Sequence, residues 1–164
     1  MQNEAAQKFI SEAPKAISPA ACRPWRFHNR STAWSDTDEQ RSLEQSIAKD
    51  GQHQPGLVRI LEGDSDYQFE VITGMRRCLA CQNNGEQFLA RIVSADTSDQ
   101  VCARFMHIEN EERANVSVLE RAKNYAALIE GGVFEQQIEL ATELGLTKSR
   151  VSQLLKAAEI FDYP

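Results

Sequence analysis

The sequence predicts an α+β protein in which a small mixed α/β domain is followed by an all-helical domain. Three segments with strand character alternate with amphipathic helical segments in the first part, at 57–61, 67–73 and 88–93. From Ser117 onward no strand pattern remains, and helical segments end at glycines. This change divides the chain into an N-terminal arm, a mixed α/β domain and a helical domain, which we expect at residues 1–21, 22–110 and 111–164.

Composition is typical of a soluble protein of the cytoplasm. The chain has 164 residues, four cysteines and a net charge of −6. No apolar run approaches the length of a membrane span, and the N-terminus lacks a signal-peptide core. We therefore expect a cytoplasmic protein that has no membrane partner and keeps its thiols reduced. The acidic total predicts weak non-specific affinity for nucleic acid.

Local signals define the first elements of the mixed domain. Residues 1–21 are rich in Ala, Ser, Gln and Pro without a sustained apolar face, which predicts a flexible arm with at most one helical turn. Cys22–Phe27 is expected to begin the ordered structure as an extended segment. Apolar residues at i and i+4 indicate an amphipathic helix over 38–49, which the glycine at position 51 ends.

Two further helices belong to the same domain. Gly74 breaks the second strand, and a helix is expected to begin at Arg76 and to end at Asn83-Asn84-Gly85. A later apolar face predicts a helix over 97–109. Each of the two helices therefore follows a strand, which is the alternation expected of a mixed α/β domain.

A candidate phosphate site lies where the second strand meets its helix. Gly74-Met75-Arg76-Arg77 places backbone N–H groups, a helix dipole and two guanidinium groups together. The same residues are also typical of a strand-to-helix turn with two solvated arginines. This motif by itself therefore leaves both interpretations open.

Two weaker motifs lie on either side of it in the chain. Gly51-Gln52-His53-Gln54-Pro55 is typical either of a binding loop or of a helix end followed by an extended entry to a strand. Glu109-Asn110 with Glu112-Arg113 is typical either of oxygen ligands beside a metal-bound polyphosphate or of a solvated helix end. The three motifs in this order, with a helix-turn-helix behind them, indicate a nucleotide pocket.

Residues 137–158 are typical of a helix-turn-helix. Ala141 supplies the small residue where the two helices cross, Gly145 the positive φ of the turn, and Val151 the anchor of the second helix. An ordinary helical hairpin has the same capping glycine and remains the alternative. The side chains expected to fill the small core are Ile138, Leu144, Leu146, Leu154 and Leu155.

The second helix of this pair is polar and locally basic. Thr147 is expected to cap it, which exposes the N-terminal turn at which recognition helices meet base edges. Arg150 suits guanine and Gln153 suits adenine. The expected DNA-contacting residues are Thr147, Lys148, Ser149, Arg150, Ser152, Gln153 and Lys156.

Taken together, these segments resemble the ParB family of chromosome and plasmid partition proteins. The matching stretches are Arg41–Pro55 with Val58 and Arg59, Val71–Arg77, Ile108–Arg113 and the helix-turn-helix 138–153. The resemblance implies an N-terminal domain that binds CTP with Mg²⁺ and hydrolyses CTP slowly. It also implies a homodimer that closes as a clamp around double-stranded DNA, loaded at a palindromic, parS-like site. A ParA-type ATPase partner and a nucleoid- or plasmid-associated location are implied as well.

The resemblance further implies roles for single residues. Those that would border the base and ribose are Gln52, Pro55, Val58 and Arg59. Those that would hold the phosphates are Thr73, Gly74, Arg76 and Arg77. Those that would face the magnesium ion and the triphosphate are Glu109 and Asn110, with Arg113 close by.

The chain departs from the family pattern in three ways. Met75 stands where the family often has Glu, and nucleotide binding is expected to survive this change. The arm carries Lys8 and Lys15 but no Arg of the kind that stimulates a ParA ATPase. The sequence ends directly after the helix-turn-helix, so we expect a piece of a longer protein that has a C-terminal dimerisation domain.

Two other functions are compatible with the same residues. The first is a helix-turn-helix transcriptional regulator that does not respond to a nucleotide. The second is a nuclease or phosphotransferase built on this fold, since related folds host several activities. A response of DNA loading to CTP separates the partition protein from the regulator, and DNA nicking that depends on Glu109 would identify a nuclease.

Overall fold

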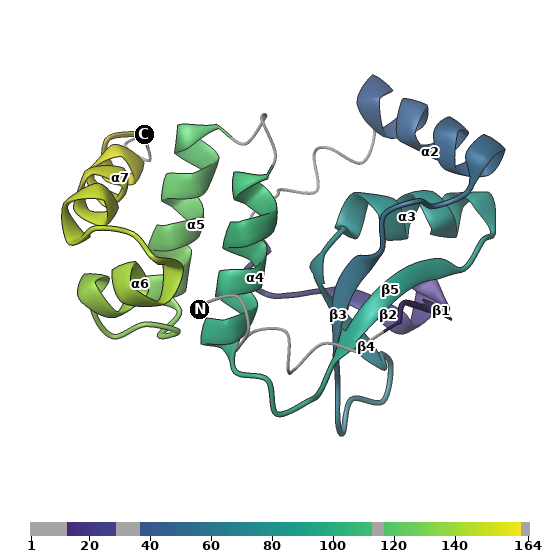
Figure 1. Ribbon diagram of the computed structural model, residues 1–164, viewed down its shortest axis with the longest axis horizontal. Coiled ribbons are helices and arrows are strands. Elements are labelled where there is room, and N and C mark those ends of the chain that lie inside the picture. Colours follow the sequence, from purple (N-terminus) through teal and green to yellow (C-terminus); the bar gives the residue numbers. More distant parts are fainter. Residues whose placement is uncertain (1–12, 29–36, 113–116, 162–164) are drawn as a thin grey trace. The chain divides into compact units, whose positions relative to one another are not determined.

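The computed structural model describes residues 13–28, 37–112 and 117–161 (Figure 1). It forms two compact units, each of which is described by itself. The first unit contains the sheet and extends to Thr97, and the second begins at Ser98 and also takes in the segment that starts at Phe27. The division into compact units thus falls before the domain boundary that the sequence predicts near residue 110. The helix before residue 110 belongs to the second unit, in which it contacts another helix.

The sheet unit contains five strands in the order β1-β5-β3-β4-β2. β3 and β4 form an antiparallel pair, whereas β3 pairs with β5 and β2 pairs with β4 in parallel. β1 closes the other edge antiparallel to β5. The strand bounds are β1 Lys15–Ile17, β2 Cys22–Pro24, β3 Gly56–Ile60, β4 Phe69–Thr73 and β5 Phe88–Val93.

The N-terminal arm is shorter than expected. β1 and the 3-10 helix η1, Pro19–Ala21, both lie inside the segment that we expected to be flexible. The backbone pairing with β5 holds β1, because a strand at a sheet edge needs no apolar periodicity of its own. Residues 1–12 lie outside the described residues.

Two helices accompany the sheet in this unit. α2, Asp38–Asp50, begins at Thr37, whose hydroxyl accepts a hydrogen bond from the backbone N–H of Gln40. α3, Met75–Asn84, runs beside α2 (Figure 1). Ile47 from α2 and Cys78 from α3 join the apolar core under the sheet. The other buried members of this core are Cys22, Val58, Val71, Ala80, Cys81, Phe88 and Ala90.

The second unit is entirely helical over the residues described. Ser98 caps α4, and Ser117 caps α5 in a reciprocal capping box with Glu120. An ion pair of 3.1 Å between Arg104 and Glu143 ties α4 to α6. The helix bounds are α4 Asp99–Glu111, α5 Val118–Glu130, α6 Gln137–Leu144 and α7 Lys148–Phe161.

A residue from the N-terminal part of the chain completes this helical unit. The Phe27 ring packs over Gly131, where an added Cβ would lie 2.2 Å from the ring. The buried Asn124 side chain donates a 3.0 Å hydrogen bond to the Phe27 carbonyl. Phe27 therefore fills space and satisfies a buried donor at the α5 end of the helical unit. None of the helices in the described part of the chain is long and apolar enough to cross a membrane.

His107 gives the helical unit a pH-dependent stability. Its imidazole Nδ1 and the Tyr125 hydroxyl lie 2.9 Å apart in a hydrogen bond, and burial lowers the pKa of His107 below its usual value of 6.5. The unfolded chain therefore takes up a proton near pH 6.5 that the folded chain resists. The stabilisation is complete above that pH and is lost as the pH falls through the lower, folded-state pKa.

We expect His107→Asn to make the free energy of unfolding less dependent on pH between 7.5 and 5. The wild-type protein should lose stability over this range, and the variant should lose less, because it has no imidazole to charge. Urea denaturation at the two pH values measures the difference. His53→Asn, which changes an exposed imidazole, is the control. Equal losses in the wild type and His107→Asn would contradict the assignment.

Candidate nucleotide site and DNA-reading helix

The predicted phosphate site is a turn between β4 and the N-terminus of α3. Gly74 adopts the left-handed conformation, with φ 90° and ψ 23°, and it is the N-cap of α3. No side chain caps this helix, so the N–H groups of its first turn face outward from the helix end. A helix end of this kind binds anions through those N–H groups and the helix dipole.

Position 74 requires glycine because a side chain would clash there, as well as because of the backbone conformation. An added Cβ would lie 2.9 Å from Nη2 of Arg77 and 3.0 Å from the Cα of Gly56. Gly56, at the start of β3, is equally crowded, since its own Cβ would lie 2.3 Å from the Phe88 ring. The two glycines let the start of β3 approach the turn closely, and they leave room for the Arg77 guanidinium.

The two arginines after Gly74 are held by different neighbours. Arg77 Nη1 donates to the Gln54 carbonyl at 3.2 Å. Arg76 Nε donates to Gln40 Oε1 at 3.0 Å, so its guanidinium lies against α2. The sequence reasoning missed Gln40 and did not assign Gln54. A buried glutamine in an amphipathic helix carries no signal that separates it from exposed polar neighbours.

Gln52 fastens the loop before β3 to the sheet. Its amide nitrogen donates to the Leu89 carbonyl at 2.8 Å, and its amide oxygen accepts from the Leu89 N–H at 2.7 Å. These bonds occupy the side chain on the backbone of β5. Pro55 is half-buried at the end of the same loop, and the side chain of Val58 is fully buried in the core. At Val58 the strand therefore has only its backbone to offer to a ligand.

Arg59 is held by the sheet. Its guanidinium pairs with the buried Glu70 on β4 and donates from Nη1 to the Thr97 carbonyl at 2.6 Å. An ion pair with so little exposure is sensitive to the removal of either partner, because an unpaired buried charge is costly. Arg59 thereby joins the β3–β4 pair to the end of the sheet unit.

The third motif lies at the end of α4. Glu109 is half-buried and Asn110 is buried, and both belong to the helical unit. A carboxylate and an amide oxygen are suitable Mg²⁺ ligands, and magnesium commonly takes only one or two ligands from a protein and the others from phosphate and water. No three His, Cys, Asp or Glu side chains in the described segments are grouped for a metal. Arg113 lies outside the described residues.

The helix-turn-helix forms as the sequence predicts. Gly145 adopts the left-handed conformation with φ 68°, and the Leu146 N–H donates to the Ala141 carbonyl at 2.8 Å, which closes the end of α6. Ala141 and Val151 are buried at the crossing of the two helices. Ile138 is wrong as a core residue, because its side chain is 46 % exposed. Leu140 lies two positions later and is buried in its place.

The first turns of α7 present polar side chains to solvent. The Thr147 hydroxyl accepts from the Arg150 N–H at 3.2 Å, so Thr147 caps α7 as expected. Ser152 is half-buried at the edge of this surface. The exposed members of the predicted DNA-contacting set are Thr147, Lys148, Ser149, Arg150, Gln153 and Lys156. The exposed set includes the cationic side chains of Lys148, Arg150 and Lys156, which are accessible to a DNA duplex.

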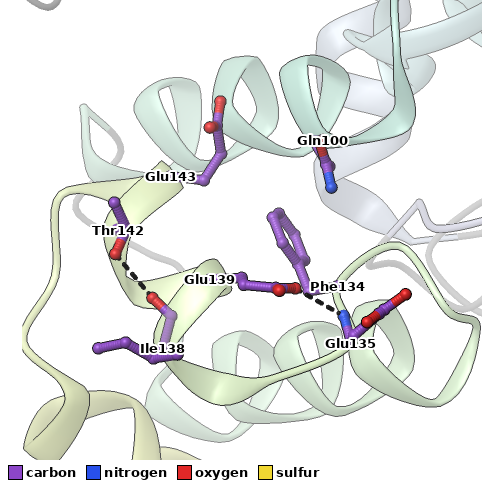
Figure 2. A pocket seen from close by; sticks show the side chains of 7 residues that line it. All are labelled: Gln100, Phe134, Glu135, Ile138, Glu139, Thr142 and Glu143. Atoms are coloured by element: carbon purple, nitrogen blue, oxygen red, sulfur yellow. Dashed lines mark hydrogen bonds between the residues drawn. The ribbon is translucent and has the colours of Figure 1, made fainter.

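The sequence gives no signal for a pocket of about 500 Å³ that is lined by α4, α6 and the segment before α6 (Figure 2). Its walls include Gln100, Phe134 and three glutamates of the segment that leads into α6 and of α6 itself. Glu143 is paired with Arg104, and Glu139 accepts from the Glu135 N–H at 2.9 Å. Two of the three carboxylates thus serve internal contacts. The acidic wall makes this pocket unsuitable for a nucleotide or for DNA.

The four cysteines are buried, and none of them forms a disulfide. Cys22 on β2 and Cys78 on α3 are joined by a thiol hydrogen bond, which lowers the pKa of Cys22 and raises that of Cys78. Burial raises the pKa of Cys81 to about 11. These environments are those of small core residues.

Comparison with known proteins identifies the family. The sequence model of the family described as ParB N-terminal domain matches residues 3–111. A nucleoid occlusion protein from Geobacillus thermodenitrificans is 33 % identical over 159 residues, which cover 97 % of this chain and 54 % of that protein. The chromosome-partitioning protein Spo0J from Thermus thermophilus is 32 % identical over 120 residues, which cover 73 % of this chain and 42 % of that protein.

A solved structure shows the same fold over nearly the whole chain. The C-terminally truncated chromosome-partitioning protein ParB from Caulobacter crescentus, complexed with CTP-γ-S, superposes with a TM-score of 0.51 at 26 % identity. The match covers 92 % of this chain and 79 % of that structure. The chain spans about two fifths to one half of the length of the curated relatives it matches. On the extent of the family match and the agreement in fold, this chain belongs to the ParB N-terminal domain family.

Proposed function

We propose that this protein is a CTP-dependent DNA-binding partition protein. The observation that carries the proposal is the combination, in one chain, of the glycine turn at the N-terminus of α3 with the exposed polar face of α7. The first feature suits a polyphosphate and the second suits a DNA groove. Similarity to a ParB crystallised with CTP-γ-S supports cytosine as the base.

Different residues of the chain would bind different parts of the nucleotide. The N–H groups that open α3 and the guanidinium groups of Arg76 and Arg77 would hold the phosphate oxygens. A bound Mg²⁺ would neutralise part of the triphosphate charge, and Glu109 and Asn110 carry the oxygen atoms suited to it. The walls of the nucleotide pocket would be shaped by backbone segments that four side chains hold in place, namely those of Gln52, Pro55, Arg59 and Thr73.

The DNA half of the proposal concerns α7. Its N-terminal turn would enter the major groove, where Arg150 is suited to guanine and Gln153 to adenine. Lys148 and Lys156 would add contacts to the phosphates. We further propose that two copies close around a palindromic site when CTP binds, and that a ParA-type ATPase acts on the resulting complex.

Calorimetric titration with CTP, ATP, GTP and UTP in magnesium tests the nucleotide half directly. We expect binding of CTP and much weaker binding of the other three. The double variant Lys148→Ala/Arg150→Ala, which changes only the DNA-reading helix, should bind CTP as the wild type does. Loss of CTP binding in that variant would indicate misfolding and not a nucleotide contact.

The other outcomes have distinct meanings. Selective binding of ATP would contradict the proposal and favour a phosphotransferase or nuclease on this fold. Absence of binding to all four nucleotides, with and without a DNA duplex, would leave a DNA-binding regulator without a nucleotide switch. DNA loading that does not change on addition of CTP would contradict the coupling between the two halves.

A further inference from the structure

A buried glutamine on α2 controls the arginine that opens the candidate phosphate site. Gln40 lies in the first turn of α2, and its side chain is 0 % exposed although it is polar and uncharged. A buried amide is unfavourable unless it is hydrogen-bonded, and an apolar residue would fill the same volume without that requirement. The side-chain amide of Gln40 is therefore expected to have specific hydrogen-bond partners.

Both ends of the Gln40 amide bind the same residue. Its oxygen accepts from Nε of Arg76 at 3.0 Å, and its nitrogen donates to the backbone carbonyl of Arg76 at 3.1 Å. An arginine Nε can only donate and a carbonyl can only accept, so this pair of bonds fits one orientation of the amide. Gln40 thereby fixes the Arg76 side chain relative to the Arg76 backbone, at the start of α3.

The remaining contacts of Arg76 leave its outer nitrogens near solvent. Nη1 lies 3.6 Å from Glu39 Oε2, and the Glu39 side chain is 84 % exposed. An exposed ion pair at that distance is weak and is readily displaced by a more highly charged anion. The Arg76 guanidinium is thus anchored at Nε, whereas Nη1 has an exposed partner and the side chain as a whole is 22 % exposed.

Hydrogen bonds between α2 and α3 fix the position of Gln40 relative to α3. The Gln40 nitrogen also donates to Glu44 Oε1 at 3.3 Å. Glu44 accepts from Asn83 at 2.7 Å through its carboxylate and from Asn84 at 2.9 Å through its carbonyl. These bonds at the far end of α3 hold the two helices in one register along their length.

We propose that Gln40 is a positioning residue that directs the Arg76 guanidinium toward the phosphates of the bound nucleotide. This inference rests on the proposed function, because it assumes that Arg76 binds phosphate. A free arginine side chain has a large rotamer entropy, and an arginine that is already anchored loses less of it when it binds. Gln40 therefore acts through Arg76 and does not itself touch the ligand.

A double-mutant cycle with Gln40→Met and Arg76→Ala tests the proposal. Methionine keeps the length of the side chain and removes both hydrogen bonds. We expect Gln40→Met to weaken CTP binding about tenfold in calorimetry, a loss comparable to that of a hydrogen bond to a charged group. In the Arg76→Ala background the same substitution should have no further effect, because the group that it positions is absent.

A second readout separates positioning from a general structural role. If Gln40 aims Arg76 at the phosphates, Gln40→Met should weaken CTP binding more than CMP binding. A merely structural role would weaken both equally. Glu39→Gln is the matched control, since it changes the neighbouring, exposed residue of the same helix turn, and its CTP affinity should stay within twofold of the wild type. Thermal unfolding of every variant shows which of them are folded at the titration temperature.

Gln40→Glu keeps the proposal testable if Gln40→Met does not fold. Its carboxylate still accepts from Arg76 Nε but neutralises the guanidinium, so CTP binding should again fall about tenfold or more. The inference would be overturned if the folded Gln40 variants bound CTP with unchanged affinity, or if their losses were additive with that of Arg76→Ala. In either case, CTP binding by the wild type would still support the proposed function. Absence of nucleotide binding in the wild type would overturn both.

Discussion

Gly74→Ala is expected to abolish measurable CTP binding while leaving the chain folded. Alanine at a positive φ costs about 1–2 kcal/mol in the free energy of unfolding. Its methyl group would also meet Nη2 of Arg77 at 2.9 Å and the Cα of Gly56 at 3.0 Å. The turn must therefore open or the Arg77 side chain must move, and either change removes phosphate-binding groups from the end of α3. Calorimetry with CTP and chemical denaturation measure the two effects separately.

Gly85→Ala is the matched control at the other end of the same helix. Gly85 caps α3 with φ 70°, so alanine suffers the same kind of backbone strain, but an added Cβ meets nothing within 4 Å. We expect a similar loss of stability and an unchanged affinity for CTP. If both variants lost CTP binding to the same degree, the loss would report the stability of α3 and would contradict a phosphate site at Gly74.

Arg150→Ala is expected to weaken binding to a selected duplex by about 1–3 kcal/mol, which is the range for the loss of a bidentate contact to guanine. Arg150 is exposed in the first turn of α7, and its backbone N–H is bonded to the Thr147 cap. The helix should therefore remain intact when the side chain is removed. The comparison requires a duplex selected from a random library and an unselected duplex of equal length, both measured by fluorescence anisotropy at one salt concentration.

Arg150→Lys distinguishes base recognition from charge. Lysine keeps the positive charge but lacks the rigid fork of the guanidinium. We expect it to retain affinity for the unselected duplex and to lose most of the preference for the selected one. Equal losses on both duplexes in Arg150→Ala would show that Arg150 contacts a phosphate and not a base.

The elements that could be predicted from sequence are those with strong local signals. The strand at 88–93 has the predicted bounds, and the Gly145 turn forms as expected, because each depends on residues adjacent in sequence. β1 and β2 have three residues each, too few for any periodicity to be read. They exist because neighbouring strands offer hydrogen bonds to their backbones.

The candidate site was predictable in its motifs and not in its supporting contacts. Gly74 and the two arginines after it could be recognised, since they combine a turn with cationic groups. The pairing of Gln40 with Arg76 spans 36 positions, and that of Gln52 with Leu89 spans 37 positions. Such contacts follow from the packing of the sheet and its helices. Nothing near Gln52 or Val58 in sequence indicated that one would be bonded to β5 and the other buried.

The contribution of Phe27 to the helical unit limits how the helix-turn-helix unit can be exchanged between proteins. A segment transplanted from Ser98 onward would lack the ring that packs on Gly131, and Asn124 would lose the carbonyl that its buried amide requires. A chimera built at that junction would carry both a hole and an unsatisfied donor. A graft that keeps the recipient's own counterpart of Phe27 would succeed only where that residue fits the same recess. The genetic unit of exchange is therefore discontinuous, and it includes a residue that the sequence places in the other half of the protein.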